Sequence, residues 1–96
     1  MATTTAIQIL IPTPLRQYTG GQSRVEATGA TVGEVLADLN TRYPGINDRI
    51  SEPDGEVRRF VNVFVNGSNV RSLDGAATPV NPGDEIGVIP AMAGGQ

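Results

Sequence analysis

The sequence predicts an α+β domain in which a mixed sheet of four to five strands packs one face against a single main helix. Two patterns predict this fold: several segments alternate apolar and polar residues at the period of a strand, and one capped segment repeats its apolar residues at the period of a helix. The chain has 96 residues, 39% of them apolar, which suffices for one core but not for two. We therefore expect a single domain over residues 1–96.

The first two predicted strands form an antiparallel hairpin. The first is predicted over residues 5–11, where three isoleucines lie on one face, and two nearby prolines end the strand. A long, glycine-containing connection leads into residues 23–27, where Val25 and Ala27 point inward between polar neighbours. Both strands should therefore present one apolar face to the same core.

The main helix is predicted to begin at Thr31. Thr31 and Glu34 have the spacing of a capping box, in which the hydroxyl accepts a hydrogen bond and the carboxylate reaches back from the first turn. The apolar stripe of the helix consists of Val32, Val35, Leu36, Leu39 and Tyr43. A Pro-Gly pair ends the helix, after which Ile46 and Ile50 are expected to pack a short turn on the core and residues 51–56 to form an exposed loop.

Residues 59–65 are the stretch with the strongest β propensity. The Asn-Gly pair that follows is the strongest short signal for a tight turn. The valines of this strand face the core, which leaves Phe60, Asn62 and Phe64 on the other face.

The last predicted strand covers residues 85–89. Residues 68–73 are expected to add a short edge strand before it, and an Asn-Pro-Gly-Asp turn leads into it. Ile86 and Val88 point inward and Ile89 points outward. Because this strand is apolar enough to lie centrally, we expect it beside the first strand and parallel to it, which is the β-grasp layout.

The segment after this strand, residues 91–96, is predicted to be a flexible tail. Pro90 cannot donate to a sheet ladder, so pairing should stop there. Gly94 and Gly95 lack a Cβ atom, which lets an extended backbone enter a narrow channel. Such a tail could carry a main-chain carboxylate to another protein's active site; the alternative is an ordinary frayed terminus.

Composition excludes several function classes. The chain has no cysteine and no histidine, which excludes thiol nucleophiles, imidazole bases and Cys/His metal sites. Its ten acidic residues are scattered along the sequence, which argues against a calcium loop or a pair of catalytic carboxylates. The net charge of −3 argues against a nucleic-acid surface. No apolar run suits a membrane span and no signal peptide is recognisable, so we expect a cytoplasmic location. We therefore do not expect the chain to be an enzyme that catalyses a reaction by itself.

On these motifs, from the strand at Ile7 through the capped helix to Gly83-Asp84-Glu85-Ile86 and the terminal Ala93-Gly94-Gly95, the chain resembles the ubiquitin-like bacterial sulfur carriers. That family includes the small subunit of molybdopterin synthase and the thiamine-biosynthesis carrier. The resemblance is strongest to the branch that supplies sulfur for cysteine. The stretches that carry it are 11–13, 19–22, 59–63 and 89–95.

The resemblance implies that an E1-like, ATP-dependent activating enzyme adenylates the carboxylate of Gly95. Sulfide or persulfide sulfur then displaces AMP and leaves a thiocarboxylate, which donates sulfur to a synthase making cysteine or a thio-metabolite. ATP is used by the enzyme, and the chain itself is expected to bind no cofactor. Gln96 departs from the family pattern, so we expect a zinc-dependent processing protease to remove it, unless the terminus is used differently.

Partner enzymes are expected to contact the outward sheet face beside the tail. The candidate contact residues are Leu10, Phe64, Ile89, Met92 and Ala93. The alternative is that loops such as residues 51–58 half-bury these side chains. Two other functions stay open at this point: a protein modifier conjugated to lysines of target proteins, and a synthase subunit that inserts its tail into an active site.

Overall fold

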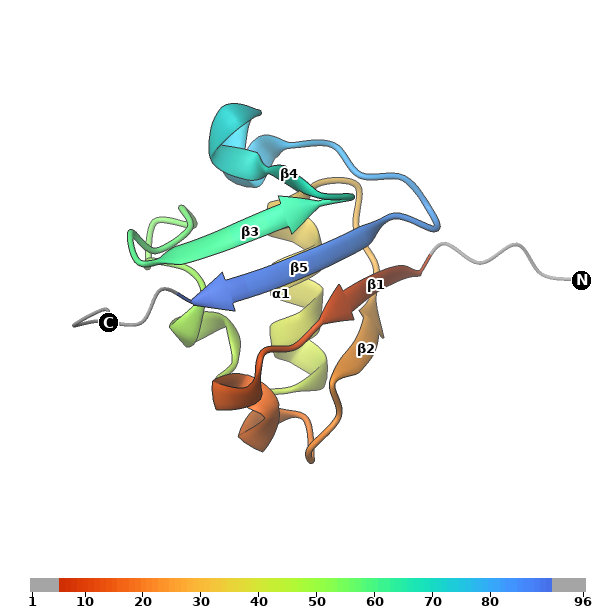
Figure 1. Ribbon diagram of the computed structural model, residues 1–96, viewed down its shortest axis with the longest axis vertical. Helices are drawn as coiled ribbons and strands as arrows, with labels where there is room; N and C mark the ends of the chain where they lie inside the picture. Colours follow the sequence, from red (N-terminus) through yellow and green to blue (C-terminus); the bar gives the residue numbers. More distant parts are fainter. Residues whose placement is uncertain (1–5, 91–96) are drawn as a thin grey trace, which may run out of the picture.

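The computed structural model describes residues 6–90, so the expectations for the tail at residues 91–96 lie outside the described residues. The sheet is five-stranded, with the order β2-β1-β5-β3-β4. Its strands are β1 (Ile7–Leu10), β2 (Arg24–Ala27), β3 (Val61–Val65), β4 (Ser68–Asn69) and β5 (Glu85–Pro90). Helix α1 (Val32–Arg42) crosses one face of this sheet (Figure 1).

The first and last strands lie side by side in the middle of the sheet, as predicted. β1 and β5 are parallel, with Ile9 beside Ile86, whereas β2 and β3 flank them in antiparallel pairing. The mixed sheet with one main helix confirms the predicted α+β, β-grasp arrangement. Within residues 6–90, no helix is long and apolar enough to cross a membrane.

Helix α1 begins where the capping pattern predicts. The Thr31 hydroxyl accepts a hydrogen bond from the Glu34 N–H at 3.3 Å. The Glu34 carboxylate accepts at 2.9 Å from the N–H of Ala30, one residue before the cap, whereas the capping-box pattern would have it accept from the cap residue itself. Both bonds satisfy N–H groups that the helix cannot satisfy internally.

The Pro-Gly pair ends the helix as predicted. Gly45 has φ of 97°, a left-handed conformation that favours glycine. The Asn40 side chain then accepts hydrogen bonds from the N–H groups of Gly45 (3.0 Å) and Asn47 (3.1 Å). These bonds hold the turn that follows the helix against the core, where Ile46 and Ile50 are both fully buried.

The core lies between α1 and the inner face of the sheet. Its largest fully buried side chains include Ile7, Ile9, Leu36, Leu39, Ile46, Ile50 and Ile86. The inward residues predicted for β1, β2, β3 and β5 are all buried, and so is the stripe of α1 up to Leu39, while Tyr43 is half-buried against the core.

Three sequence-based expectations are wrong in detail. Ser51 is buried and donates a hydrogen bond to the Asn47 side chain at 2.9 Å, so the loop at 51–56 is not exposed throughout. β3 begins at Val61 because the Val61 N–H closes a turn onto the Arg58 carbonyl at 3.0 Å. β4 has only two residues because a 3₁₀ turn, η3 (Val70–Ser72), follows at once.

Further 3₁₀ turns connect the elements: η1 (Thr13–Tyr18), η2 (Asn47–Arg49) and η4 (Gly75–Ala77). The first of them was not predicted, because its two prolines indicate a break. It buries Leu15, which extends the core beyond the end of β1.

Candidate functional site

The outer face of the sheet, opposite α1, is polar where β5 begins. In the β-ladder Gln8 lies between Glu26 of β2 and Glu85 of β5. The Gln8 amide donates to the Glu26 carboxylate at 2.8 Å, and Arg24 pairs with Glu85 at 3.2 Å. At this end of the face, the polar side chains therefore form hydrogen bonds and ion pairs with one another.

The same face becomes apolar toward Pro90. Leu10 of β1 and Phe64 of β3 both align with Gly87 of β5, and Ile89 lies two residues further along β5, opposite Asn62. Leu10 and Phe64 are half-buried, while the Ile89 side chain is 55% exposed. The structure thus brings together the three predicted contact residues that it describes, here called the outer patch; Met92 and Ala93 lie outside the described residues.

Gly87 leaves a gap in the middle of the outer patch. A Cβ atom built on Gly87 would meet no atom within 4 Å, and its backbone is not in the left-handed region. The fold therefore does not require glycine there. Its effect is to open the space between Leu10 and Phe64.

A further apolar side chain lies at the end of β5. Val61 faces Pro90 in the ladder, and Phe60, just before Val61, is 64% exposed. The β propensity of residues 59–65 predicts Phe60 as part of a strand, and Phe60 is not among the predicted contact residues. In the structure it belongs to a turn, so strand alternation does not settle where its ring points.

The turn that carries Phe60 is held by Arg71. One guanidinium nitrogen, Nη2, donates to the carbonyls of Arg58 (2.6 Å), Arg59 (3.1 Å) and Val61 (2.6 Å). The sequence offered no signal for this contact, because it joins residues 10 to 13 positions apart through the folding of β3 onto η3.

Two ionisable groups among residues 6–90 have shifted pKa values, and neither lies on the outer sheet face. The pKa of Asp38 in α1 is lowered, chiefly by the hydrogen bond from the Thr28 N–H and next by Arg42. The pKa of Arg49 in η2 is raised by its hydrogen bond to the Tyr18 hydroxyl. Both groups join neighbouring elements, and in residues 6–90 no three His, Cys, Asp or Glu side chains are placed to hold a metal ion.

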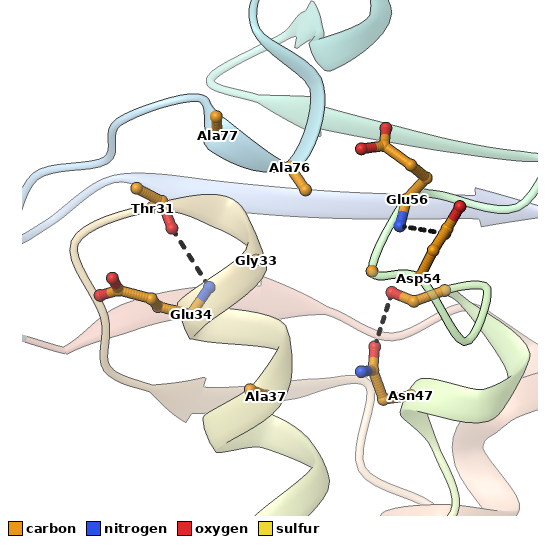
Figure 2. A pocket seen from close by; sticks show the side chains of 11 residues that line it. Thr31, Gly33, Glu34, Ala37, Asn47, Asp54, Glu56, Ala76 and Ala77 are labelled. Atoms are coloured by element: carbon orange, nitrogen blue, oxygen red, sulfur yellow. Dashed lines mark hydrogen bonds between the residues drawn. The ribbon is translucent and has the colours of Figure 1, made fainter.

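A pocket of ≈ 500 Å³ lies on the α1 side of the sheet, between the start of the helix, the loop at 51–56 and η4 (Figure 2). Two of its three carboxylates already serve as local acceptors: Glu34 accepts from the Ala30 N–H, and Asp54 accepts from the Glu56 N–H at 3.0 Å. None of the predicted site residues lines this pocket. The candidate site is therefore the outer patch and the chain that leaves it at Pro90.

Comparison with known proteins decides the family. The model of the ThiS family matches residues 9–95. The chain belongs to the ThiS family. This confirms the resemblance to the ubiquitin-like sulfur carriers, and the matched segment extends from β1 to the second glycine of the tail.

Individual relatives of this ThiS-family chain are carriers and modifiers by name. It is 45% identical over 91 residues to the sulfur carrier protein CysO of Mycobacterium tuberculosis, covering 93% of this chain and 98% of the relative. It is 50% identical over 66 residues to small archaeal modifier protein 3 of Haloferax volcanii, covering 69% and 71% of the two chains. These relatives support the prediction of a carrier and not a catalyst.

Among solved structures, the ThiS-family chain is similar to one in a crystal structure of the BexX/CysO complex of Amycolatopsis orientalis. The TM-score is 0.88 at 43% sequence identity, covering 94% of this chain and 100% of that chain. This agreement confirms the β-grasp fold independently of the strand pattern.

Proposed function

We propose that this chain is a sulfur carrier whose Gly95 acyl group is converted to a thiocarboxylate in the cytoplasm. The observation that carries the proposal is the 45% identity to a sulfur carrier protein over nearly the whole chain. The family match also includes Gly95 itself. β5 supports the proposal physically, because it leads the chain from an apolar face directly into the tail.

The proposed chemistry has two displacement steps. A carboxylate oxygen of Gly95 attacks the α-phosphorus of ATP, and pyrophosphate leaves. The sulfur of sulfide then attacks the acyl carbon, AMP leaves with the bonding electrons, and a thiocarboxylate remains. With a persulfide as the donor the same attack gives an acyl disulfide, and a second thiol must reduce its S–S bond to release the thiocarboxylate. ATP is bound by the activating enzyme, which is E1-like in this proposal, and not by the carrier.

The composition of the chain protects an activated acyl group. The sequence has no cysteine, no histidine and no lysine, so neither a thiol nor an ε-amine of its own can attack Gly95. A thiocarboxylate is a stronger acid than a cysteine thiol, whose pKa is about 8.5, so it would be anionic and nucleophilic at neutral pH.

Gln96 must be removed before Gly95 can be activated. In the sequence Gly95 is joined to Gln96 by a peptide bond, so its carboxylate is free only after that bond is cleaved. We assign this cleavage to a zinc-dependent protease. After removal, Gly94 and Gly95 present no side chain to the channel of the activating enzyme.

The outer patch is the proposed contact surface for the activating enzyme and for the sulfur-accepting synthase. Leu10, Phe64 and Ile89 supply the apolar part of it, and Met92 and Ala93 would continue it along the tail. The known BexX/CysO complex of a similar chain supports the existence of a protein partner.

A second candidate is conjugation to lysines of other proteins. The observation that favours it is the 50% identity over 66 residues to a small archaeal modifier protein. Both functions need the same activated Gly95, so they differ only in the nucleophile that receives the acyl group.

Mass spectrometry tests the proposal and separates these functions. The chain ending at Gln96 and the chain ending at Gly95 are each incubated with the activating enzyme, ATP and sulfide. We expect an oxygen-to-sulfur exchange at Gly95 only in the shorter chain. Adducts on target proteins would favour the modifier, and thiolation at residue 96 would refute the need for processing. If neither product forms, the carrier role is wrong and a tail-inserting synthase subunit is favoured.

A further inference from the structure

We infer that Phe60 is an anchor for the activating enzyme, that Arg71 positions it, and that the enzyme offers an apolar pocket with a carboxylate beside it. The inference rests on the proposed function, in which an activating enzyme binds the tail and adenylates Gly95. It adds to the outer patch a second contact, built on the turn at residues 58–61.

The reach of the tail limits where the enzyme can sit. Gly95 is the fifth residue after Pro90, and five fully extended residues span at most about 18 Å. An active site that holds Gly95 must therefore lie close to the end of β5. Because Val61 faces Pro90, the Cα atom of Phe60 lies within about 9 Å of that of Pro90.

Phe60 has the properties of a binding anchor. Its side chain is 64% exposed, more than those of Ile89 (55%) and Leu73 (47%). Within the described residues it is not part of the apolar core, so the fold gains little from an aromatic residue there. Exposed aromatic side chains next to a functional end of a protein are typical centres of binding energy.

The turn beneath Phe60 is unusually well held. The Arg71 guanidinium binds three of its carbonyls, and the Arg71 N–H donates at 2.9 Å to the Asn69 side chain. Asn69 in turn donates to the Asn62 side chain on β3 at 3.3 Å. A turn fixed in this way loses less conformational entropy when a partner binds, so the backbone that carries Phe60 is preorganised.

The charges around Phe60 indicate the chemistry of the partner. Arg58 is paired with Glu52 at 3.2 Å, and Arg71 is occupied by the carbonyls. Arg59 is exposed and makes no ion pair within residues 6–90. Phe60, Arg58, Arg59 and Glu52 line one hollow of ≈ 470 Å³. An apolar pocket bordered by a carboxylate would match the ring and the unpaired guanidinium together.

The test measures the affinity of the full chain for the activating enzyme by calorimetry, and KM and kcat for adenylation of the chain ending at Gly95. We expect Phe60→Ala to weaken binding and raise KM about tenfold without changing kcat, as for an interfacial hot spot. The matched control is Leu73→Ala, which removes another exposed apolar side chain and should change KM less than twofold. Arg59→Glu should raise KM, whereas Arg24→Glu on β2 should not.

A double-mutant cycle tests the positioning role of Arg71. We expect Arg71→Ala to raise KM and to lower the melting temperature. In the Phe60→Ala background the same change should still lower the melting temperature but should raise KM much less than in the unaltered chain, because the ring that Arg71 positions is gone. Additive effects on KM would mean that Arg71 is only structural.

The outcomes separate this inference from the proposed function. If the unaltered chain is adenylated and Phe60→Ala behaves like it, the anchor is wrong and the carrier role stands. If Phe60→Ala affects only the synthase, the assignment to the activating enzyme is wrong. If the unaltered chain neither binds the enzyme nor is adenylated, both proposals fail.

Discussion

At the scale of single residues, one carboxylate oxygen connects the end of β2 with α1. Asp38 Oδ2 accepts hydrogen bonds from the Thr28 N–H (2.9 Å) and the Arg42 Nε (2.8 Å). These bonds lower the pKa of Asp38 from the usual 3.8. Because the pKa is depressed in the folded state, the stabilisation is present above the unfolded pKa and is lost as the pH falls through the folded pKa.

We therefore predict that Asp38→Ala lowers the free energy of unfolding by about 1 kcal/mol at neutral pH. The difference from the unaltered chain should shrink as the pH falls below 3.8. Urea denaturation at a series of pH values measures this. Asp74→Ala is the control, since the Asp74 carboxylate makes no hydrogen bond or ion pair within residues 6–90. An equal loss at every pH would exclude the carboxylate charge as the cause.

At the scale of elements, the β3–β4 hairpin depends on a turn that only certain residues can form. Asn66 has φ of 51° and Gly67 has φ of 90°, both in the left-handed region. Such turns match the right-handed twist of the strands they join, which is why Asn-Gly pairs predict them. Gly87, in contrast, has ordinary strand geometry and room for a side chain.

The same substitution at these two glycines should have opposite effects on stability. We predict that Gly67→Ala destabilises the fold by about 1 kcal/mol, because alanine is strained at positive φ. Gly87→Ala should stabilise it by up to about 1 kcal/mol, because alanine has less freedom to lose on folding. Thermal unfolding of both variants gives the comparison. Destabilisation by Gly87→Ala would show that the close packing of β5 tolerates no side chain there.

The elements that the sequence predicts correctly are those whose signals are local. The alternation in β1 and β5 and the threonine before α1 depend on residues a few positions apart, so Leu10, Phe64 and Ile89 could be placed on one face from the sequence. The turn that removes Phe60 from β3 was missed because its carbonyls are held by Arg71, a contact that exists only after folding. The predictions for Gly94 and Gly95 concern the tail, which lies outside the described residues.

At the scale of the whole molecule, the described residues form one core that includes both the first and the last strand. It extends from Ile7 in β1 to Val88 in β5, and the strand pairing reaches Pro90. We predict that a chain ending at Pro90 melts within about 3 °C of the full chain, a shift worth less than about 1 kcal/mol, but is not adenylated. A chain ending at Gly87 is the control: it lacks buried Val88 and half of β5, so it should fail to fold. Loss of the fold at Pro90 would mean that the tail contributes to stability.

The parallel pairing of β1 and β5 also has a mechanical consequence. The start of β1 and the end of β5 lie at opposite sides of the sheet (Figure 1). A pulling force between those two points would load the inter-strand hydrogen bonds together, in shear, instead of breaking them one at a time. An enzyme could therefore pull on the segment after Pro90 without unfolding the domain.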